Sequence, residues 1–326
     1  MEQSIMRNGA REVYPLIMEP SFRCGQSTPW GGHALKEKYG KNTPEEITGE
    51  SLEISALPGH ESRITNGSYR GKSLREVFAI WGDWLTGKRE KTFPLMLKLL
   101  DAQQCLSVQV HPDDAYALSH EGKLGKSEAW YILDAAPGAR LVYGIDTHGE
   151  NLEAIVKEGR LEECLHWVEV RPGDVFYIPS GTIHALGSGI QCYEIQQSSD
   201  VTYRFWDWGR VGKDGKLREL HTRQALSVSK EEAPSGAADT EEKACEGGRV
   251  TPLVSDPHFR LDAVDLAGTW TMPAGRMQFL TTTVPCTLRW GTHRHELAAY
   301  RSVLVPAKMD EVRITGKGRV LVSSAV

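Results

Sequence analysis

The strongest indication of the fold of this 326-residue chain is the stretch Gly173-Asp-Val-Phe-Tyr-Ile-Pro179-Ser-Gly181-Thr-Ile-His184. It consists of a short apolar strand, a tight turn built around Pro179 and Gly181, and a histidine that enters the next strand. Proline fixes one backbone torsion angle, and glycine adopts conformations that other residues resist, so the turn determines the position of His184. Taken alone, His184 could be a metal ligand or an ordinary polar residue of a barrel.

A second segment, Leu106-Ser-Val-Gln-Val-His111, alternates apolar and polar residues. Alternate residues of a strand share a face, so Ser107, Gln109 and His111 should point together into a barrel interior. The following Pro112-Asp-Asp114 should end the strand and start a helical turn.

A third segment, Lys126-Ser-Glu128-Ala-Trp130, places its lysine, glutamate and tryptophan on one strand face by the same alternation. Polar groups on an inward face are costly to bury unless they are paired or coordinate something. Lys126 could also lie at the surface near a turn, because glycines stand beside it.

Four residues from these segments supply two nitrogen and two oxygen ligands: Gln109, His111, Glu128 and His184. Such a set suits a divalent transition metal, with zinc expected first and manganese, iron or cobalt possible. A set with one carboxylate and no thiolate predicts an open water position, which is typical of catalytic metals. The other histidines, His221 among them, lack such neighbours and are expected to be ordinary polar residues.

The composition describes an ordinary globular protein, with 40% hydrophobic and 25% charged residues and a formal charge of −5. This charge argues against nucleic acid as a partner, and no apolar run is long enough to span a membrane. The six cysteines are scattered without a C-x-x-C pair, and the first residues lack the apolar run of a signal peptide. We therefore expect reduced cysteines and a cytoplasmic protein; the oligomeric state is left open.

The distribution of polar, small and apolar residues along the sequence predicts that the chain is divided into three parts. Residues 230–248 are polar and rich in small residues, which indicates a linker or an exposed loop. The short apolar segments of 249–326 predict a compact all-β module. Residues 1–229 are expected to form the main domain, in which strands dominate and a few helices are inserted. One helix should start at the capping box Ser73-Leu-Arg-Glu76, and another should lie within 151–168, broken at Gly159.

Several blocks resemble known proteins. The Gly173–His184 stretch matches the second motif of the cupin superfamily, in which the histidine is a metal ligand at the mouth of a small β-barrel. Blocks along nearly the whole chain resemble the type I phosphomannose isomerases of the short bacterial kind: Pro29–Gly32, Gly49–Ser55, Phe93–Ala102, Leu106–Asp114, Gly125–Tyr131, Gly173–His184, Ser199–Asp207 and Ser302–Ala307.

This resemblance implies a mainly β fold, with a jelly-roll cupin catalytic domain carrying helical insertions and a smaller cupin-like C-terminal module. It implies a zinc-dependent isomerase that interconverts mannose 6-phosphate and fructose 6-phosphate. The family's metal ligands fall on the same four residues, its active-site arginine on Arg204, its lysine on Lys126 and its serine on Ser107.

The chemistry moves a proton between C1 and C2 of the sugar through a cis-enediol, with the metal as Lewis acid. Arg204 and Lys126 are the cationic candidates, and Trp30, Lys98 and Glu194 are candidates for lining the pocket. For the base, Glu194 and a metal-bound hydroxide are both open. Two other functions remain as alternatives, a cupin metal oxygenase and a non-catalytic sugar-binding cupin.

Overall fold

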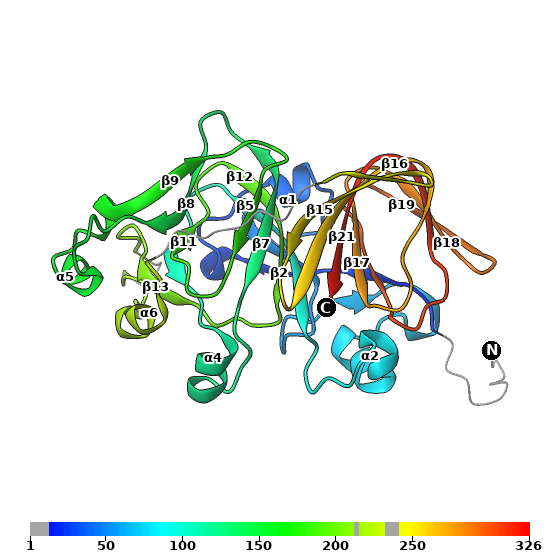
Figure 1. Ribbon diagram of the computed structural model, residues 1–326, viewed down its shortest axis with the longest axis horizontal. Helices are drawn as coiled ribbons and strands as arrows, with labels where there is room; N and C mark the ends of the chain where they lie inside the picture. The colour runs from blue at the N-terminus through cyan, green and yellow to red at the C-terminus, as the bar shows by residue number, and fades with distance from the viewer. Residues whose placement is uncertain (1–12, 212–214, 232–240) are drawn as a thin grey trace.

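Two antiparallel sheets face each other and enclose a barrel in the N-terminal two thirds of the chain (Figure 1). The computed structural model describes residues 13–211, 215–231 and 241–326. The larger sheet of the barrel has six strands in the order β10 (Val175–Ile178), β7 (Glu128–Ala135), β12 (Ile190–Gln197), β5 (Leu95–Ala102), β3 (Thr48–Ile54) and β2 (Ser21–Cys24). The smaller sheet has five strands in the order β13 (Tyr203–Trp206), β6 (Val108–Val110), β11 (His184–Ala185), β8 (Arg140–Ile145) and β9 (Leu165–Glu169).

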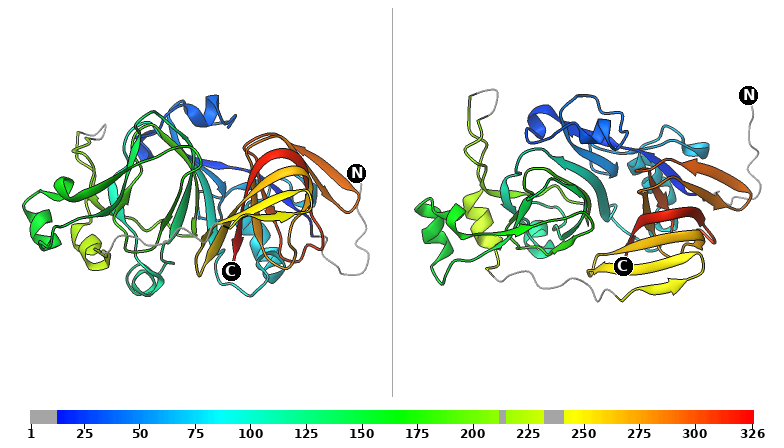
Figure 2. Two further views of the ribbon diagram at one scale, coloured as in Figure 1. Left: turned by 45° about the horizontal axis from the view of Figure 1, so that its top comes forward. Right: turned by 90° about the horizontal axis from the view of Figure 1, so that it is seen from above.

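The C-terminal strands form a separate sheet beside the barrel (Figure 2). Its order is β14 (Lys243–Cys245), β15 (Gly248–Ser255), β16 (Phe259–Thr271), β21 (Arg313–Ala325), β17 (Gln278–Thr282), β20 (Ser302–Val305), β1 (Leu16–Glu19) and β4 (Arg63–Ile64). Strand β18 (Cys286–Trp290) pairs with β21 and with β19 (His293–Leu297). The fold is therefore mainly β and of the cupin type, as the sequence predicts.

The three-part division predicted from sequence remains a prediction, and two features of the sheets bear on it. Strand β14 and the start of β15 lie within the range predicted as a linker, of which residues 232–240 are outside the described part. Strands β1 and β4 come from the N-terminal part yet pair into the C-terminal sheet, where β1 lies against β20. The C-terminal sheet is thus completed by the beginning of the chain.

The helices are short and lie around the barrel and between the sheets. They are α1 (Ala34–Glu37), α2 (Leu74–Trp81), α3 (Asp83–Thr86), α4 (Asp114–His120), α5 (Leu152–Lys157) and α6 (Thr222–Val228), with 3₁₀ turns η1 (Gly25–Ser27), η2 (Gly67–Tyr69) and η3 (Leu161–Cys164). None of the helices in the described part of the chain is long and apolar enough to cross a bilayer.

Local sequence signals explain where these helices begin and end. Ser73 and Glu76 form the predicted capping box of α2, and the helix ends at Gly82, whose φ of 54° is costly for other residues. Within 151–168 the predicted break is present: Gly159, with φ 72°, separates α5 from η3. The last residues of that range belong to β9 instead of a helix.

One cluster of buried apolar side chains joins the barrel to the C-terminal sheet. It includes Leu97 and Ile195 from the larger barrel sheet, Trp81 from α2, and Phe259 and Phe279 from the C-terminal sheet. Burial of such side chains stabilises by roughly 1.5–3 kcal/mol each. The two parts therefore share one hydrophobic core, which fixes the barrel against the C-terminal sheet.

A buried ion pair crosses the same boundary. Lys41 Nζ lies 2.6 Å from Glu53 Oε1, and both side chains are only 1% exposed. The ammonium also donates to the carbonyl of Tyr300 at 2.6 Å, and Ser302 donates to the other oxygen of Glu53 at 2.9 Å. Burial lowers the pKa of Lys41, and the charge of Glu53 opposes that shift. The pair links strand β3 of the barrel to strand β20 of the C-terminal sheet.

We expect Lys41→Met to lower the free energy of unfolding by about 3–5 kcal/mol, because it leaves Glu53 buried without its counter-charge. Denaturant unfolding followed by tryptophan fluorescence measures the change. The matched control is Lys72→Met, which removes an exposed lysine paired with Glu76 on the surface and should change stability little. Equal effects of the two variants would contradict the structural importance of the buried pair.

Candidate metal centre and active-site cavity

Three buried side chains converge inside the barrel: His111, Glu128 and His184. His184 Nε2 lies 3.1 Å from Glu128 Oε1, and His111 Nε2 lies 3.8 Å from Glu128 Oε2. One candidate ligand atom from each residue lies within 4.8 Å of the others, and all three side chains are at most 1% exposed. These three of the four predicted ligands therefore form one group that could hold a metal ion.

The strands explain why these residues meet. His184 pairs with Gln109 across β11 and β6, and His111 follows directly after β6. Glu128 begins β7, where it pairs with Ile178 at the end of β10, just before the Pro/Gly turn. The alternation predicted for the strand around Gln109 is present, because the valines on either side of it in β6 are buried in a cluster of apolar side chains.

The turn that precedes His184 is tied to the other histidine. Gly181 has φ 90°, and its amide donates a hydrogen bond to the carbonyl of His111 at 2.8 Å. A Cβ atom at Gly181 would stand 2.9 Å from the Val228 carbonyl oxygen, so the position also lacks room for a side chain. Both the torsion angle and the close approach require glycine there.

Backbone carbonyls determine the tautomer of both histidines. His111 Nδ1 lies 2.8 Å from the carbonyl of Val201, and His184 Nδ1 lies 2.9 Å from the carbonyl of Thr182. A carbonyl only accepts, so each Nδ1 must carry the proton. The Nε2 atom of each ring then faces Glu128, which is the arrangement that metal-bound histidines use.

The charges of the group agree with a metal site. The pKa of His111 lies well below its usual range because of burial and the neighbouring Lys126, so the ring is neutral. Burial raises the pKa of Glu128, but Lys126 and the two histidines lower it by more than burial raises it. The pKa of Glu128 therefore lies well below its usual range. The group thus offers a neutral imidazole at His111, the imidazole of His184 and one carboxylate.

In the described part of the chain, several polar atoms of the His/Glu/His group make no well-formed hydrogen bond. Both oxygens of Glu128 and Nε2 of His184 are buried, and within the described residues their close charged contacts to Lys126 and to each other lack the geometry of a hydrogen bond. Buried polar atoms without well-formed hydrogen bonds are rare because they lose their hydration without full compensation. A divalent cation among the three side chains would satisfy all of these atoms, so the residues fit a bound metal ion.

Lys126 belongs to the same group. Its ammonium lies 2.7 Å from Glu128 Oε2 and 3.1 Å from His111 Nε2, and its side chain is 6% exposed. The alternative of a surface lysine is therefore wrong. Lys126 places a fixed positive charge beside the carboxylate.

A cavity of about 300 Å³ adjoins this group and collects the remaining predicted residues. Its lining includes Trp30, Lys98, Ser107, Gln109, Lys126, Glu194 and Arg204. Its volume is at the lower end of the range for small-molecule sites, and its lining is unusually rich in charged groups. Every predicted substrate and catalytic residue thus lines one cavity, although the residues come from strands and loops that are distant in the sequence.

Lys98 is buried in this cavity between two carboxylates. Its ammonium lies 3.2 Å from Glu194 Oε1 and 3.6 Å from Glu50 Oε2. Burial lowers the pKa of Lys98, but Glu194 and Glu50 raise it more, so the pKa is raised overall and the lysine is charged. The other oxygen of Glu194 accepts a hydrogen bond from Trp130 Nε1 at 2.7 Å. Lys98 and Glu194 are thus held in one polar network.

Arg204 stands on strand β13, next to Gln109 of β6. Its Nε atom is buried, and among the described residues no hydrogen bond or ion pair engages the guanidinium. Burial and the charge of nearby Arg218 lower the pKa of Arg204. Two guanidinium groups side by side in a cavity, one of them without a carboxylate partner, favour the binding of an anion.

Several residues that line this cavity were not predicted from the sequence: Arg23, Glu50, Arg218 and His221. His221 Nδ1 accepts a hydrogen bond from the backbone amide of Arg204 at 3.3 Å, so this histidine, expected to be an ordinary polar residue, lies at the cavity and supports the strand of Arg204. Arg218 lies 3.4 Å from the buried carboxylate of Asp207. Neither residue belongs to a periodic pattern, and no sequence signal pointed to them.

The fold and the site together define a cupin-type protein with a buried His/Glu/His group that opens beside a polar cavity. Comparisons with known proteins narrow this class. Residues 22–132 match the family model for the catalytic domain of phosphomannose isomerase type I.

Two bacterial proteins are similar over most of the chain. The mannose-6-phosphate isomerase of Streptococcus mutans is 41% identical over 259 residues, which cover 78% of this chain and 82% of that protein. The mannose-6-phosphate isomerase ManA of Bacillus subtilis is 36% identical over 317 residues, which cover 95% of this chain and 98% of that protein.

A solved structure agrees with the fold. The mannose 6-phosphate isomerase structure from Bacillus subtilis superimposes with a TM-score of 0.89 at 33% identity, covering 95% of this chain and 99% of that chain. The chain therefore belongs to the type I phosphomannose isomerases and is an isomerase.

Proposed function

We propose that this enzyme interconverts mannose 6-phosphate and fructose 6-phosphate. The observation that carries the proposal is the cavity lined by Lys126 and Arg204, in which Lys126 also contacts the buried His/Glu/His group. The relatives named mannose-6-phosphate isomerase support the same reaction. The substrate is a phosphorylated hexose, for which a cavity with several cations is suited.

We assign the metal ligands to Gln109, His111, Glu128 and His184, and we propose zinc as the metal. Two imidazoles with oxygen ligands are typical of zinc, although manganese, iron or cobalt would also accept them. Gln109 lines the cavity and pairs with His184 across the sheet, which supports its place in the set. When bound, the metal would act as a Lewis acid that stabilises negative charge on the sugar oxygens.

The reaction moves a proton between C1 and C2 through a cis-enediol, and the chain's own residues prepare the sugar for it. Lys126 and Arg204 are the cationic groups that stabilise the enediolate or hold the phosphate. Ser107, Trp30, Lys98 and Glu194 line the cavity and bind the sugar. Because these groups are held in place before the substrate binds, little reorganisation is needed during the reaction.

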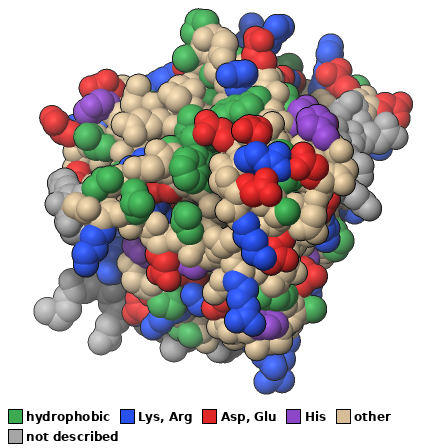
Figure 3. Space-filling view, turned by 90° about the vertical axis from the view of Figure 1, so that its left-hand side faces the viewer, with side chains coloured by type: hydrophobic (Ala, Val, Ile, Leu, Met, Phe, Trp, Pro, Cys, Tyr) green, Lys and Arg blue, Asp and Glu red, His purple; other side chains and the backbone are tan. Residues whose placement is uncertain are grey.

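We further propose that the protein works in the cytoplasm as an enzyme of sugar metabolism, without nucleic acid or a membrane as partner. All six cysteines are free, which is typical of a reducing compartment. The face at the barrel end shows acidic, basic and apolar side chains interspersed, with no sign of charge dominating among its described residues (Figure 3). Such a surface is not typical of nucleic-acid binding.

A coupled assay tests the proposed function. Fructose 6-phosphate formed from mannose 6-phosphate is followed in the purified protein, then after chelation, then after addition of zinc, with manganese, iron and cobalt in parallel. We expect activity that chelation removes and zinc restores. A protein that holds stoichiometric metal but shows no isomerase activity would overturn the proposal, and iron-dependent oxygen consumption in that protein would favour an oxygenase.

We expect His184→Ala to lose both bound metal and activity while the protein remains folded, because one ligand of the group is removed. Metal content by mass spectrometry, turnover and circular dichroism report the three properties. The matched control is His293→Ala, which changes an exposed histidine of β19 and should keep metal and activity. Wild-type metal content in His184→Ala would refute the ligand assignment.

Arg204→Ala should keep the metal but lower kcat by about 10²–10³-fold, the usual cost of removing one electrostatic contact to the transition state. Steady-state kinetics and metal analysis of the same sample measure both effects. Arg223→Ala, which removes an exposed arginine of α6, serves as the control and should leave kcat unchanged. Near-normal turnover of Arg204→Ala would remove this residue from the active site.

A further inference from the structure

The segment Gly125–Ser127, which carries Lys126 into the metal group, is held from its outer side by one carboxylate. Asp114 Oδ1 accepts a hydrogen bond from the amide of Gly125 at 2.7 Å. The same oxygen accepts a second hydrogen bond from Gln197 Nε2 at 3.0 Å. A single carboxylate oxygen thus joins the start of this segment to the end of strand β12.

Gln197 holds the other end of the segment. Its Oε1 accepts from the amide of Ser127 at 2.9 Å, and its own backbone amide donates to the carbonyl of Ser127 at 3.1 Å. The side chain of Gln197 is 3% exposed, so these bonds are shielded from water. We call Asp114 and Gln197 together the outer bracket of the segment.

The segment passes so close to the start of α4 that there is no room for a side chain at Gly125. A Cβ atom on Gly125 would stand 2.4 Å from the carbonyl carbon of Asp113, so only glycine fits. The amide of Lys126 also donates to the carbonyl of Pro112 at 2.9 Å. The amides of Gly125 and Lys126 are therefore both hydrogen-bonded to the Pro112–Asp114 segment that follows His111.

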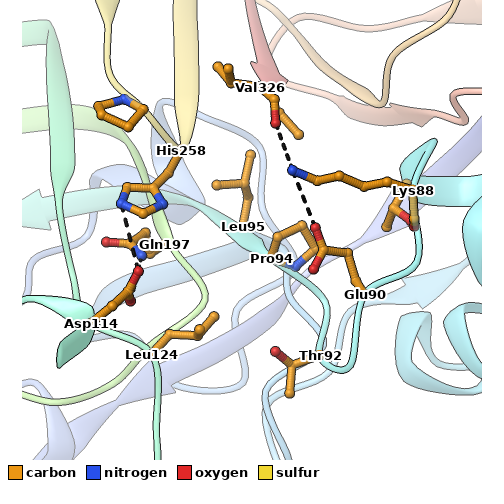
Figure 4. A pocket seen from close by; sticks show the side chains of 13 residues that line it. Lys88, Glu90, Thr92, Pro94, Leu95, Asp114, Leu124, Gln197, His258 and Val326 are labelled. Carbon is orange, nitrogen blue, oxygen red and sulfur yellow. Dashed lines mark hydrogen bonds and ion pairs between the residues drawn. The ribbon is translucent and has the colours of Figure 1, made fainter. Parts of the chain in front are cut away.

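The outer bracket is open to a second cavity, which lies between the barrel and the C-terminal strands. This cavity has a volume of about 210 Å³, and Asp114, Gln197 and His258 line it (Figure 4). His258 Nε2 lies 3.8 Å from Asp114 Oδ2, the oxygen that does not hold the segment. The two oxygens of Asp114 thus face different parts of the molecule.

We propose that Asp114 and Gln197 are positioning residues, which act on the reaction by fixing Lys126 and Glu128 relative to each other. Lys126 Nζ lies 2.7 Å from Glu128 Oε2, and the lysine has a long flexible side chain. A site of this kind keeps its geometry only if the supporting groups hold the main chain to within about 0.5 Å. The proposal rests on the proposed function, because it assigns its effect to Lys126 and the metal group.

Two substitutions of Asp114 separate positioning from charge. Asp114→Ala removes both hydrogen bonds of Oδ1 and should lower kcat at least tenfold while KM changes less than threefold. It should also weaken metal binding by about 10–100-fold, as loss of a group that supports metal ligands does. Asp114→Asn keeps an oxygen that can accept both bonds, so its kcat and metal affinity should stay within threefold of wild type.

Two control variants change neighbouring groups but leave the hydrogen bonds of Asp114 Oδ1 and of Gln197 in place. Asp113→Ala removes the cap of the same helix, where Asp113 Oδ1 accepts from the amide of Tyr116 at 2.9 Å. It should lower the melting temperature by a few degrees without a selective loss of kcat or metal affinity. His258→Ala removes the contact to the other oxygen of Asp114 and should leave kcat within twofold.

The proposal is wrong if Asp114→Ala keeps wild-type kcat and metal affinity, or if Asp114→Asn is damaged as much as Asp114→Ala. A tenfold loss of kcat in His258→Ala would also overturn it, because Asp114 would then act through the C-terminal sheet. Metal affinity, measured by competition with a chromophoric chelator, needs no substrate. It therefore tests the outer bracket even if the protein has no mannose-6-phosphate isomerase activity.

Discussion

The buried carboxylate of Glu128 is the constraint on which the rest of the site depends. An ionised carboxylate in a barrel interior is stable only if other groups compensate its charge. Lys126 supplies one positive charge at 2.7 Å, and burial keeps the ring of His111 neutral beside it. Because each Nδ1 donates to a backbone carbonyl, both Nε2 atoms lie on the side of the carboxylate. The three side chains thus form a group that could hold a divalent metal.

A few local features of the fold place these side chains. The Pro/Gly turn brings His184 beside β6, and the amide of Gly181 bonds to the carbonyl of His111, so the two histidines are placed by one turn. The larger barrel sheet then provides Lys98 and Glu194, which face the same cavity from neighbouring strands. The C-terminal sheet contributes the other side of the shared core, and β1 from the beginning of the chain completes that sheet.

Much of this could be predicted from sequence because it depends on period-two alternation and turn chemistry. The alternation around Gln109 and Glu128 indicated which side chains point inward, and the Pro/Gly turn indicated where His184 lies. Arg218 and His221 could not be predicted, because they reach the cavity from an irregular segment beyond β13 where no period relates position to direction. The pairing of β1 with β20 could not be predicted from the sequence either, since contacts between distant strands depend on the shared core and not on a local pattern.

We propose that His111, Glu128 and His184 hold the metal on which isomerisation depends. Crystals of the purified protein, loaded with zinc and measured on both sides of the zinc absorption edge, test this assignment. We expect one anomalous peak about 2.0–2.2 Å from Nε2 of both histidines and from an oxygen of Glu128. A fully active zinc-loaded protein whose anomalous peak lies elsewhere, or which shows none at this group, would contradict it.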